Sequence, residues 1–165
     1  MGQRIKAVYS AGAFLKRDGL YLLMKRGLDR KRFPGLWSNI GGGIEAHELY
    51  DPQQACLREI LEESGIQPHE VFNLELRYVI ISRIKDVLRY SYIYFGETDA
   101  VELMETEEGT LHWVPEDELL DREYSPTFTA MMRHYLETPE DGRVVIGVVE
   151  NRGGSVNWSV ADDIA

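Results

Sequence analysis

Three glutamates at helical spacing are the residues of this chain whose arrangement could do chemistry. Glu59, Glu62 and Glu63 stand three and four residues apart, so they share one face of a helix if this segment is helical. Like charges at this spacing repel one another, so the arrangement costs stability unless a cation neutralises it. Mg²⁺ prefers oxygen ligands and commonly binds one or two carboxylates together with substrate phosphates. The pattern therefore predicts a divalent-metal site, with Mg²⁺ as the expected ion and Mn²⁺ as a substitute.

The residues around this cluster resemble the Nudix box, G-x5-E-x7-R-E-U-x-E-E-x-G-U, in which U is aliphatic. Gly42 and Glu48 match its first half. Seven residues match its second half: Arg58, Glu59, Ile60, Glu62, Glu63, Gly65 and Ile66. The chain departs from the pattern at one point, because nine residues separate Glu48 from Arg58 where the family has seven. We expect the extra pair in the loop around Leu49 and Tyr50, since a loop tolerates added residues at small entropic cost.

The resemblance, which covers residues 5–137, implies an activity and a fold. Nudix enzymes hydrolyse a nucleoside diphosphate linked to another group. We therefore expect Mg²⁺-dependent hydrolysis of the diphosphate linkage in a nucleoside di- or triphosphate derivative. Water must attack a phosphorus atom shielded by anionic oxygens, and a bound metal neutralises those oxygens and activates the water. The expected fold is α/β: a Nudix α/β/α sandwich with a mixed, curved β-sheet between helices.

The same resemblance implies roles in metal binding. Glu62 and Glu63 correspond to the family's main metal ligands, and Glu59 corresponds to a glutamate that is either a ligand or the general base. Gly41 corresponds to the position whose backbone carbonyl binds the metal, where glycine lets the backbone approach closely. The glutamate that acts as base varies within the family, so this assignment stays open. The catalytic candidates are Arg58, Glu59 and Glu63.

Arg58 is expected to orient the glutamates by salt bridging. Its guanidinium geometry suits bidentate contacts with carboxylates. It can reach Glu62 one helical turn away, and Glu48 is a second candidate partner across the loop.

Residues outside the box complete the predicted site. In this family a further glutamate often comes from the loop before a late tryptophan strand, and here that loop is residues 105–109, with Glu107 as first choice and Glu108 as second. Candidate substrate contacts precede the glycine run: Arg26, Arg30, Arg32, Phe33 and Trp37. Surface solubility explains the arginines nearly as well, and we favour core or rim packing for Trp37. Four residues of the central strands are candidates to line the cleft: Tyr78, Arg83, Arg89 and Tyr92.

The element that must position the carboxylates is a helix over residues 52–64. Asp51 is a good N-cap, Pro52 is favoured in the first turn, and Gly65 is a good residue to end the helix. Its apolar positions should face the sheet, away from Glu59 and Glu63: Ala55, Cys56, Ile60 and Leu61. Cys56 is therefore predicted to be a small core residue rather than a nucleophile.

The remaining elements follow from apolar runs and turn residues. Strands are predicted at 5–15, 21–24, 71–83, 88–95, 111–114 and 143–149, with a hairpin turn at Asp18-Gly19. A short helix is predicted from Pro115 to Leu119, and a second full helix over 126–136. We expect a Nudix domain over 1–140 and an extension over 141–165 that packs on it. From Asn151 this tail either returns as a hairpin through Gly153-Gly154 to 156–158 or is partly disordered.

Chain length, net charge and cysteine content limit the possible functions. A chain of 165 residues fits one domain. The net charge of −10 argues against a nucleic-acid polymer as ligand, because no basic stripe is available, but it leaves a small-molecule nucleotide open. The single cysteine suits a reducing compartment, and neither a signal peptide nor a membrane span is evident. A cytoplasmic protein without membrane partners is expected.

Several other interpretations compete. The segment 33–39 also resembles isopentenyl-diphosphate isomerase, but that enzyme needs a cysteine where this chain has residues 40–43. A non-catalytic nucleotide-sensing module is the alternative from another class, although such Nudix-like domains usually lose box glutamates and none is lost here. Within the hydrolases, residues 33–37 are similar to those of MutT-like nucleoside triphosphate pyrophosphatases, and an ADP-ribose or nucleotide-sugar pyrophosphatase is the runner-up. The strand over 144–149 and the Trp158 tail either add to the sheet or cover a partner subunit, and we favour a homodimer.

Overall fold

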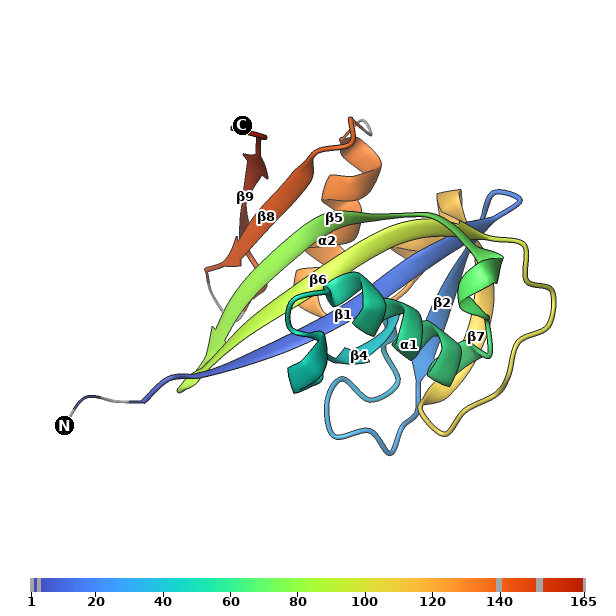
Figure 1. The fold of residues 1–165 in the computed structure, drawn as a ribbon, viewed down its shortest axis with the longest axis horizontal. Helices are drawn as coiled ribbons and strands as arrows, with labels where there is room; N and C mark the ends of the chain where they lie inside the picture. Colours follow the sequence, from blue (N-terminus) through green and yellow to red (C-terminus); the bar gives the residue numbers. More distant parts are fainter. Residues whose placement is uncertain (1, 3, 139–140, 151–152, 165) are drawn as a thin grey trace.

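The computed structural model describes residue 2 and residues 4–138, 141–150 and 153–164. In these residues one mixed, curved sheet lies between helices α1 (Pro52–Ser64) and α2 (Pro126–Glu137), so the predicted α/β sandwich is confirmed (Figure 1). The strands are β1 (Lys6–Arg17), β2 (Leu20–Arg26), β3 (Trp37–Ser38), β4 (Ile40–Gly43), β5 (Val71–Ile84), β6 (Val87–Thr98), β7 (Gly109–Pro115), β8 (Val144–Val149) and β9 (Val156–Ala161). Three 3₁₀ turns complete the list: η1 (Ala46–Glu48), η2 (Pro68–Glu70) and η3 (Glu116–Asp121).

A fork in the sheet, where one edge of β1 pairs first with β4 and then with β2, positions the glycine run. The strand order is β3-β2-β1-β6-β5-β8-β9, with β4 paired to β1 and β7 paired to β2. On one side of β1, residues Ser10 to Ala13 pair with β4, whereas Leu15 to Arg17 pair with β2. On the other side β1 runs parallel to β6. Helix α1 packs on both β1 and β4, so the glycine run lies between the middle of β1 and this helix.

Helix α1 begins and ends as the sequence predicts. The Asp51 side chain accepts a hydrogen bond from the Gln54 backbone N–H at 3.2 Å, and Gly65 ends the helix with a φ of 76°. Two details differ from the expected apolar face. Leu61 is only half-buried, and Glu59 and Glu63 are buried rather than turned to solvent, because the glycine run covers them.

Each face of the sheet carries its own core, because successive side chains of a strand point to opposite faces. The core under α1 joins β1, β2 and β4 to the helix: Ala11, Ala13, Leu15, Leu22, Ile40, Ala55, Cys56 and Ile60. The core under α2 is more aromatic: Phe14, Tyr21, Tyr78, Phe95, Tyr124, Met131, Met132 and Tyr135 are among its members. Cys56 is fully buried, and burial raises the pKa of its thiol to about 12, as expected for a core residue rather than a nucleophile.

The C-terminal strands extend the same sheet. β8 pairs in parallel with β5, and β9 returns antiparallel along β8. Trp158 of β9 packs edge-on against Tyr78, with ring centroids 5.5 Å apart, and lies 4.8 Å from the His134 ring of α2. Asn151, where the tail was predicted to begin, lies outside the described residues. Within the described ranges, no helix is both long enough and apolar enough to cross a membrane.

Replacing Trp158 by alanine should lower the free energy of unfolding by about 2 kcal/mol, because it removes a half-buried aromatic ring from the α2 core. Urea unfolding followed by circular dichroism would measure the loss. The exposed Val160 on the same strand provides the control, and its alanine variant should change stability by less than about 0.5 kcal/mol. Equal stabilities for wild type and the Trp158 variant would mean that residues 141–165 do not pack on the domain in solution.

Candidate active site

Two carboxylates of α1 are buried against the glycine run. Glu59 and Glu63 are each only 9% exposed. The Gly41 backbone N–H donates a hydrogen bond to Glu63 Oε2 at 3.0 Å. A Cβ at Gly42 would lie 2.6 Å from the Glu59 carboxyl atoms, so any other residue here would displace the carboxyl from this position. The fork in the sheet and the packing of α1 on it therefore bring the Glu59 and Glu63 carboxyls to the same run of glycines.

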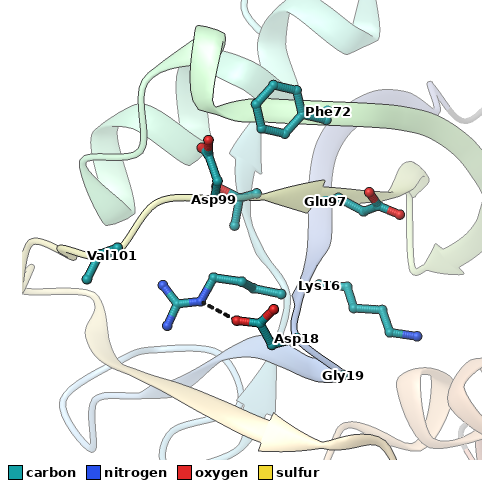
Figure 2. Close-up of a pocket in the computed structure, with 9 residues that line it drawn as sticks. Lys16, Asp18, Gly19, Phe72, Glu97, Asp99 and Val101 are labelled. Atoms are coloured by element: carbon teal, nitrogen blue, oxygen red, sulfur yellow. Dashed lines mark ion pairs between the residues drawn. The ribbon is translucent and has the colours of Figure 1, made fainter.

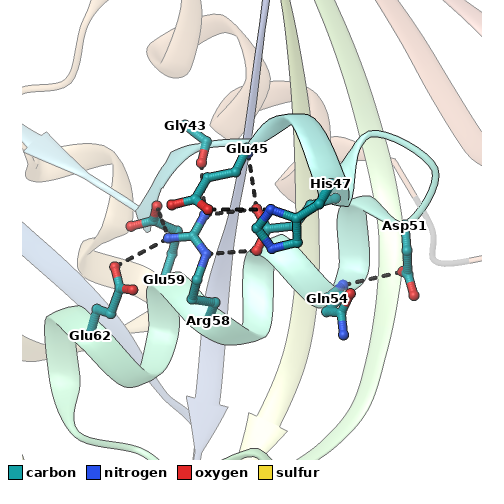
Figure 3. A network of polar contacts seen from close by, with 9 residues as sticks. Gly43, Glu45, His47, Asp51, Gln54, Arg58, Glu59 and Glu62 are labelled. Carbon is teal, nitrogen blue, oxygen red and sulfur yellow. Dashed lines mark hydrogen bonds and ion pairs between the residues drawn. The ribbon is translucent and has the colours of Figure 1, made fainter.

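The Arg58 guanidinium organises these carboxylates (Figure 3). Its Nε and Nη2 donate to the two oxygens of Glu48 at 2.7 and 2.9 Å, which is a bidentate contact. Its Nη1 donates to Glu59 Oε1 at 2.8 Å and to Glu62 Oε2 at 3.2 Å, and Nη2 also reaches the Gly43 carbonyl at 2.9 Å. Both contacts expected of Arg58, to Glu62 and to Glu48, are present.

The added pair of residues lies in the loop, as predicted. Glu48 ends the short turn η1, and the helix begins at Pro52. Between them Leu49 and Tyr50 point outward, and Tyr50 is fully exposed. The insertion therefore leaves the spacing of the carboxylates on α1 unchanged.

Burial and hydrogen bonding shift the carboxyl pKa values of the site in opposite directions. Glu48 is 2% exposed, yet the hydrogen bonds from Arg58 lower its pKa to about 2. Burial raises the pKa of Glu63 to about 8, against the opposing hydrogen bond from Gly41. Burial also raises the pKa of Glu59, although Arg58 opposes that shift. Two carboxyls that resist ionisation side by side form an unfavourable arrangement that a cation would relieve.

The donor set fits a hard divalent cation, since it consists of carboxylate and backbone carbonyl oxygens. The Glu59 carboxyl occupies the space left by the missing side chain of Gly42, and Glu63 lies one turn further along the same helix face. Among the described residues, however, no three acidic, histidine or cysteine side chains are already gathered around one point. Glu62 explains this, because its half-exposed carboxylate points to Arg58 instead of joining Glu59 and Glu63.

The two candidate glutamates in the loop before β7, Glu107 and Glu108, differ in their surroundings. Glu108 forms an ion pair with Arg30, and its negative charge is among the causes that raise the pKa of Glu63. Its negative charge therefore reaches the buried Glu63. Glu107, the first choice from the sequence, is exposed to solvent.

The candidate substrate residues differ in whether they act on the buried carboxyls or pack against the α2 core. Arg26 lies at the end of β2, and its positive charge acts on Glu63. Its Nε donates to the Arg32 carbonyl at 3.0 Å, so the two arginines are held together. Trp37 is half-buried, lies edge-on to His112 with ring centroids 5.0 Å apart, and packs against the α2 core. Trp37 thus packs at the rim of the α2 core, and its role as a substrate contact stays a prediction.

A cavity of about 680 Å³ lies at the other end of the sheet, around the β1–β2 turn (Figure 2). Lys16, Asp18, Phe72, Glu97 and Asp99 are among its lining residues, and it does not include a box residue. It is therefore separate from the candidate site.

Sequence reasoning named the Gly41 carbonyl but missed two other backbone groups of the site. The Gly43 carbonyl holds Arg58, and the Gly41 N–H holds Glu63. Backbone groups carry no sequence signal of their own, and only the run of glycines indicated that the chain comes close to the helix here.

Replacing Glu48 by glutamine should lower the free energy of unfolding at pH 7 by about 3 kcal/mol, because it removes one partner of a buried ion pair. The folded pKa of about 2 lies below the ordinary 4.5, so the carboxylate stabilises the fold at neutral pH, and this contribution is lost as the pH falls from 4.5 toward 2. Urea unfolding at pH 7 and pH 3 would measure both effects.

The half-exposed Glu118–Arg122 pair provides the control, since Glu118→Gln should cost less than about 1 kcal/mol. Equal losses in the two variants would contradict the role of Glu48 as a buried anchor.

The chain is similar to known proteins in sequence and in structure. The sequence profile of the NUDIX domain matches residues 6–135. The nucleoside triphosphatase NudI of Escherichia coli O139:H28 is 47% identical over 53 residues, which are 32% of this chain and 36% of that protein. The match thus spans about a third of the curated relative.

Two solved structures share the fold. The MutT protein of Bacillus halodurans gives a TM-score of 0.72 at 20% identity, covering 93% of this chain and 97% of that one. The NUDIX domain of Shewanella oneidensis NrtR, solved with ADP-ribose, gives 0.60 at 18% identity, covering 82% and 89%. Because the family profile spans most of the chain, this protein belongs to the Nudix hydrolase family.

Proposed function

We propose that the protein hydrolyses the diphosphate linkage of a nucleoside di- or triphosphate derivative with Mg²⁺ bound at the glycine run. The observation that carries this proposal is the pair of buried carboxylates, Glu59 and Glu63, pressed against Gly41 and Gly42. Folding alone does not favour two such groups together, and an oxygen-ligated cation offsets their repulsion. The hydrolase class also agrees with family membership.

The residues that would hold the cation are Glu59, Glu63, the Gly41 carbonyl and Glu108. Glu62 joins them only when it leaves Arg58, to which it is joined at 3.2 Å by its Oε2 atom. When bound, the cation supplies positive charge to the phosphate oxygens and acidifies a water molecule. The Arg58 guanidinium keeps Glu59 in place, and the Glu48 carboxylate neutralises the positive charge of Arg58.

The chemical step is a hydrolysis. The oxygen of a water molecule forms a bond to phosphorus, and the bond from that phosphorus to the bridging oxygen breaks. The water proton passes to Glu59 or Glu63, and the leaving phosphate takes the electron pair of the broken bond. Glu63, whose pKa is raised by burial, and Glu59, which is hydrogen-bonded to Arg58, are the two candidate bases.

We propose a nucleoside triphosphate as the first substrate class and ADP-ribose or a nucleotide sugar as the second. The relative NudI is a nucleoside triphosphatase, and the NrtR domain was solved with ADP-ribose. The intact set of box glutamates supports hydrolysis over a purely nucleotide-sensing role.

The decisive assay is Mg²⁺-dependent release of phosphate or pyrophosphate from a panel of compounds. The panel should contain the four dNTPs, oxidised dGTP, ADP-ribose, UDP-glucose and diadenosine polyphosphates. Glu59→Gln and Glu63→Gln should each lower kcat by at least about a hundredfold, because each removes a metal ligand or a base.

The control is Glu137→Gln, an exposed carboxylate on α2 whose loss should leave kcat unchanged. Binding of one compound without turnover in the wild type would refute the hydrolase and favour a sensing module.

A second test compares Glu107 with Glu108. Glu108→Gln should raise the Mg²⁺ concentration needed for half-maximal activity by about tenfold, because a negative charge that acts on Glu63 is lost. Glu107→Gln, which removes the same charge from the solvent side of the loop, should leave the Mg²⁺ dependence unchanged. A larger effect from Glu107 would restore the first choice made from the sequence.

A further inference from the structure

On the side of the sheet that carries α1, the helix covers only part of the surface. Helix α1 packs mainly on β1 and β4, and β5, β6 and β8 extend beyond it (Figure 1). The strand register identifies the side chains of the uncovered area, because paired residues point to the same face of a sheet. This area, which we call the open face, consists of seven residues: Tyr9, Val79, Ile81, Leu88, Tyr90, Ile146 and Val148.

The open face packs against neither core of the domain. Within the part of the chain that the structure describes, none of its seven side chains joins the α1 core or the α2 core, and all seven are at least partly exposed. Two of the strand pairs beneath it, β1–β6 and β5–β8, are parallel, and parallel strands are usually covered on both faces. The sequence has the matching pattern, because residues 79–81 and 144–149 are unbroken apolar runs rather than polar alternations. We therefore expect a second surface to cover this face.

The open face is about as large as a small dimer interface. Five strands spaced ~4.8 Å apart (β1, β6, β5, β8 and β9) span roughly 24 Å, and three rows of side chains along them span roughly 20 Å. The resulting area of about 500 Å² is close to the ~600 Å² per partner at the lower limit of specific interfaces. The loop from β4 to α1, which is tied to the sheet by a 3.0 Å hydrogen bond from the Ile44 N–H to the Tyr9 carbonyl, borders the face (Figure 1). Its exposed Leu49 and Tyr50 extend the apolar area.

The two ends of the open face differ in charge, while its seven side chains are uncharged. Four basic and two acidic residues lie at the end near the β5–β6 turn: Arg4, Lys6, Arg83, Lys85, Asp86 and Glu150. Three acidic and two basic residues lie at the other end, beyond the Val144–Ala161 pair: Asp141, Asp162, Asp163, Arg77 and Arg143. A two-fold axis that runs across the strands would place the positive end of one copy over the negative end of the other. The face is thus complementary to itself.

We infer that the protein forms a homodimer in which the open faces of two copies pack against each other, sheet on sheet. Tyr9 and Tyr90, whose ring centroids are 5.2 Å apart, supply the large aromatic groups that are enriched at interfaces. A nucleic acid or an anionic membrane does not suit this face, because the chain has a net charge of −10. The inference gives a surface to the homodimer expected from the sequence, and it does not depend on the proposed function.

Sedimentation equilibrium tests the dimer. At micromolar concentration the wild type should have twice the 18.9 kDa mass of one chain. Val148→Lys should raise the Kd of the dimer at least about a hundredfold, because a two-fold interface buries the added charge twice. The matched control is Val160→Lys, which should leave the Kd unchanged. Val160 is 45% exposed against 47% for Val148, lies on the adjacent strand, and faces the α2 side through its pairing with Val145.

Cross-linking identifies the face that meets the partner. Cys56, the only cysteine of the chain, is fully buried, so a cysteine introduced at the surface reacts alone. Ile81 lies on the central strand of the open face and in its middle row, so the two-fold axis brings it close to its copy. A short bismaleimide should therefore join two chains of Ile81→Cys into a covalent dimer, whereas Val160→Cys should remain a single chain in a denaturing gel. Thermal unfolding of every variant checks that the fold is retained.

A wild type that stays monomeric at every concentration would overturn the inference, as would a dimer that Val148→Lys leaves intact. Loss of the dimer in both lysine variants would also overturn it, because an interface along the edge of β9 would respond to both. The proposed function is judged separately by turnover. A monomeric hydrolase would refute the dimer alone, and a dimer that hydrolyses no compound in the panel would refute the hydrolase alone.

Discussion

The guanidinium of Arg58 is the interaction on which the candidate site depends. It joins the loop after β4, through Glu48 and the Gly43 carbonyl, to the face of α1 that carries Glu59 and Glu62. Arginine suits this position because it remains charged at any working pH and presents five N–H donors in one plane. A lysine would have one nitrogen to offer to the same acceptors. The positions of the carboxylates are thus set by a single side chain, whose own position is set by the buried Glu48.

Two acidic side chains of α1 are buried against the glycine run. Glu59 and Glu63 are each shielded from solvent there, where Gly41 and Gly42 approach them closely. This pair costs the isolated protein stability, whereas apolar residues of similar size would not. Groups that are unfavourable for folding but complementary to a bound cation or anion are the usual mark of a site selected for binding. A divalent cation bound by both carboxyls would relieve this cost.

Local signals made the fold predictable in most of its parts. Asp51, Pro52 and Gly65 mark both ends of α1, and apolar runs mark the long strands. The burial of Glu59 and Glu63 was not predictable in the same way, because it depends on β4 pairing with β1 and covering the helix. Periodicity places a residue on a face of its own element, but it does not say which other element covers that face.

Long-range register limited the site prediction for the same reason. The choice between Glu107 and Glu108 depends on how β7 pairs with β2, where Arg26 lies opposite Gly109. Arg89 was one of four strand residues suggested for the cleft, and the sequence could not say which face it takes until the pairing with Ser82 was known. The Arg58 contacts were predictable because helical spacing fixes one partner and the box pattern suggests the other.

The outward-pointing pair Leu49 and Tyr50 has a consequence for how such chains are found. Because the extra residues lie in the loop before the N-cap, the number of residues between Glu48 and Arg58 can change without moving the two side chains apart. The two side chains remain at hydrogen-bond distance in space. A text search that requires a constant interval between the two halves of the box would discard this sequence. The invariant of the motif is a three-dimensional contact, and only a search that allows gaps at the loop respects it.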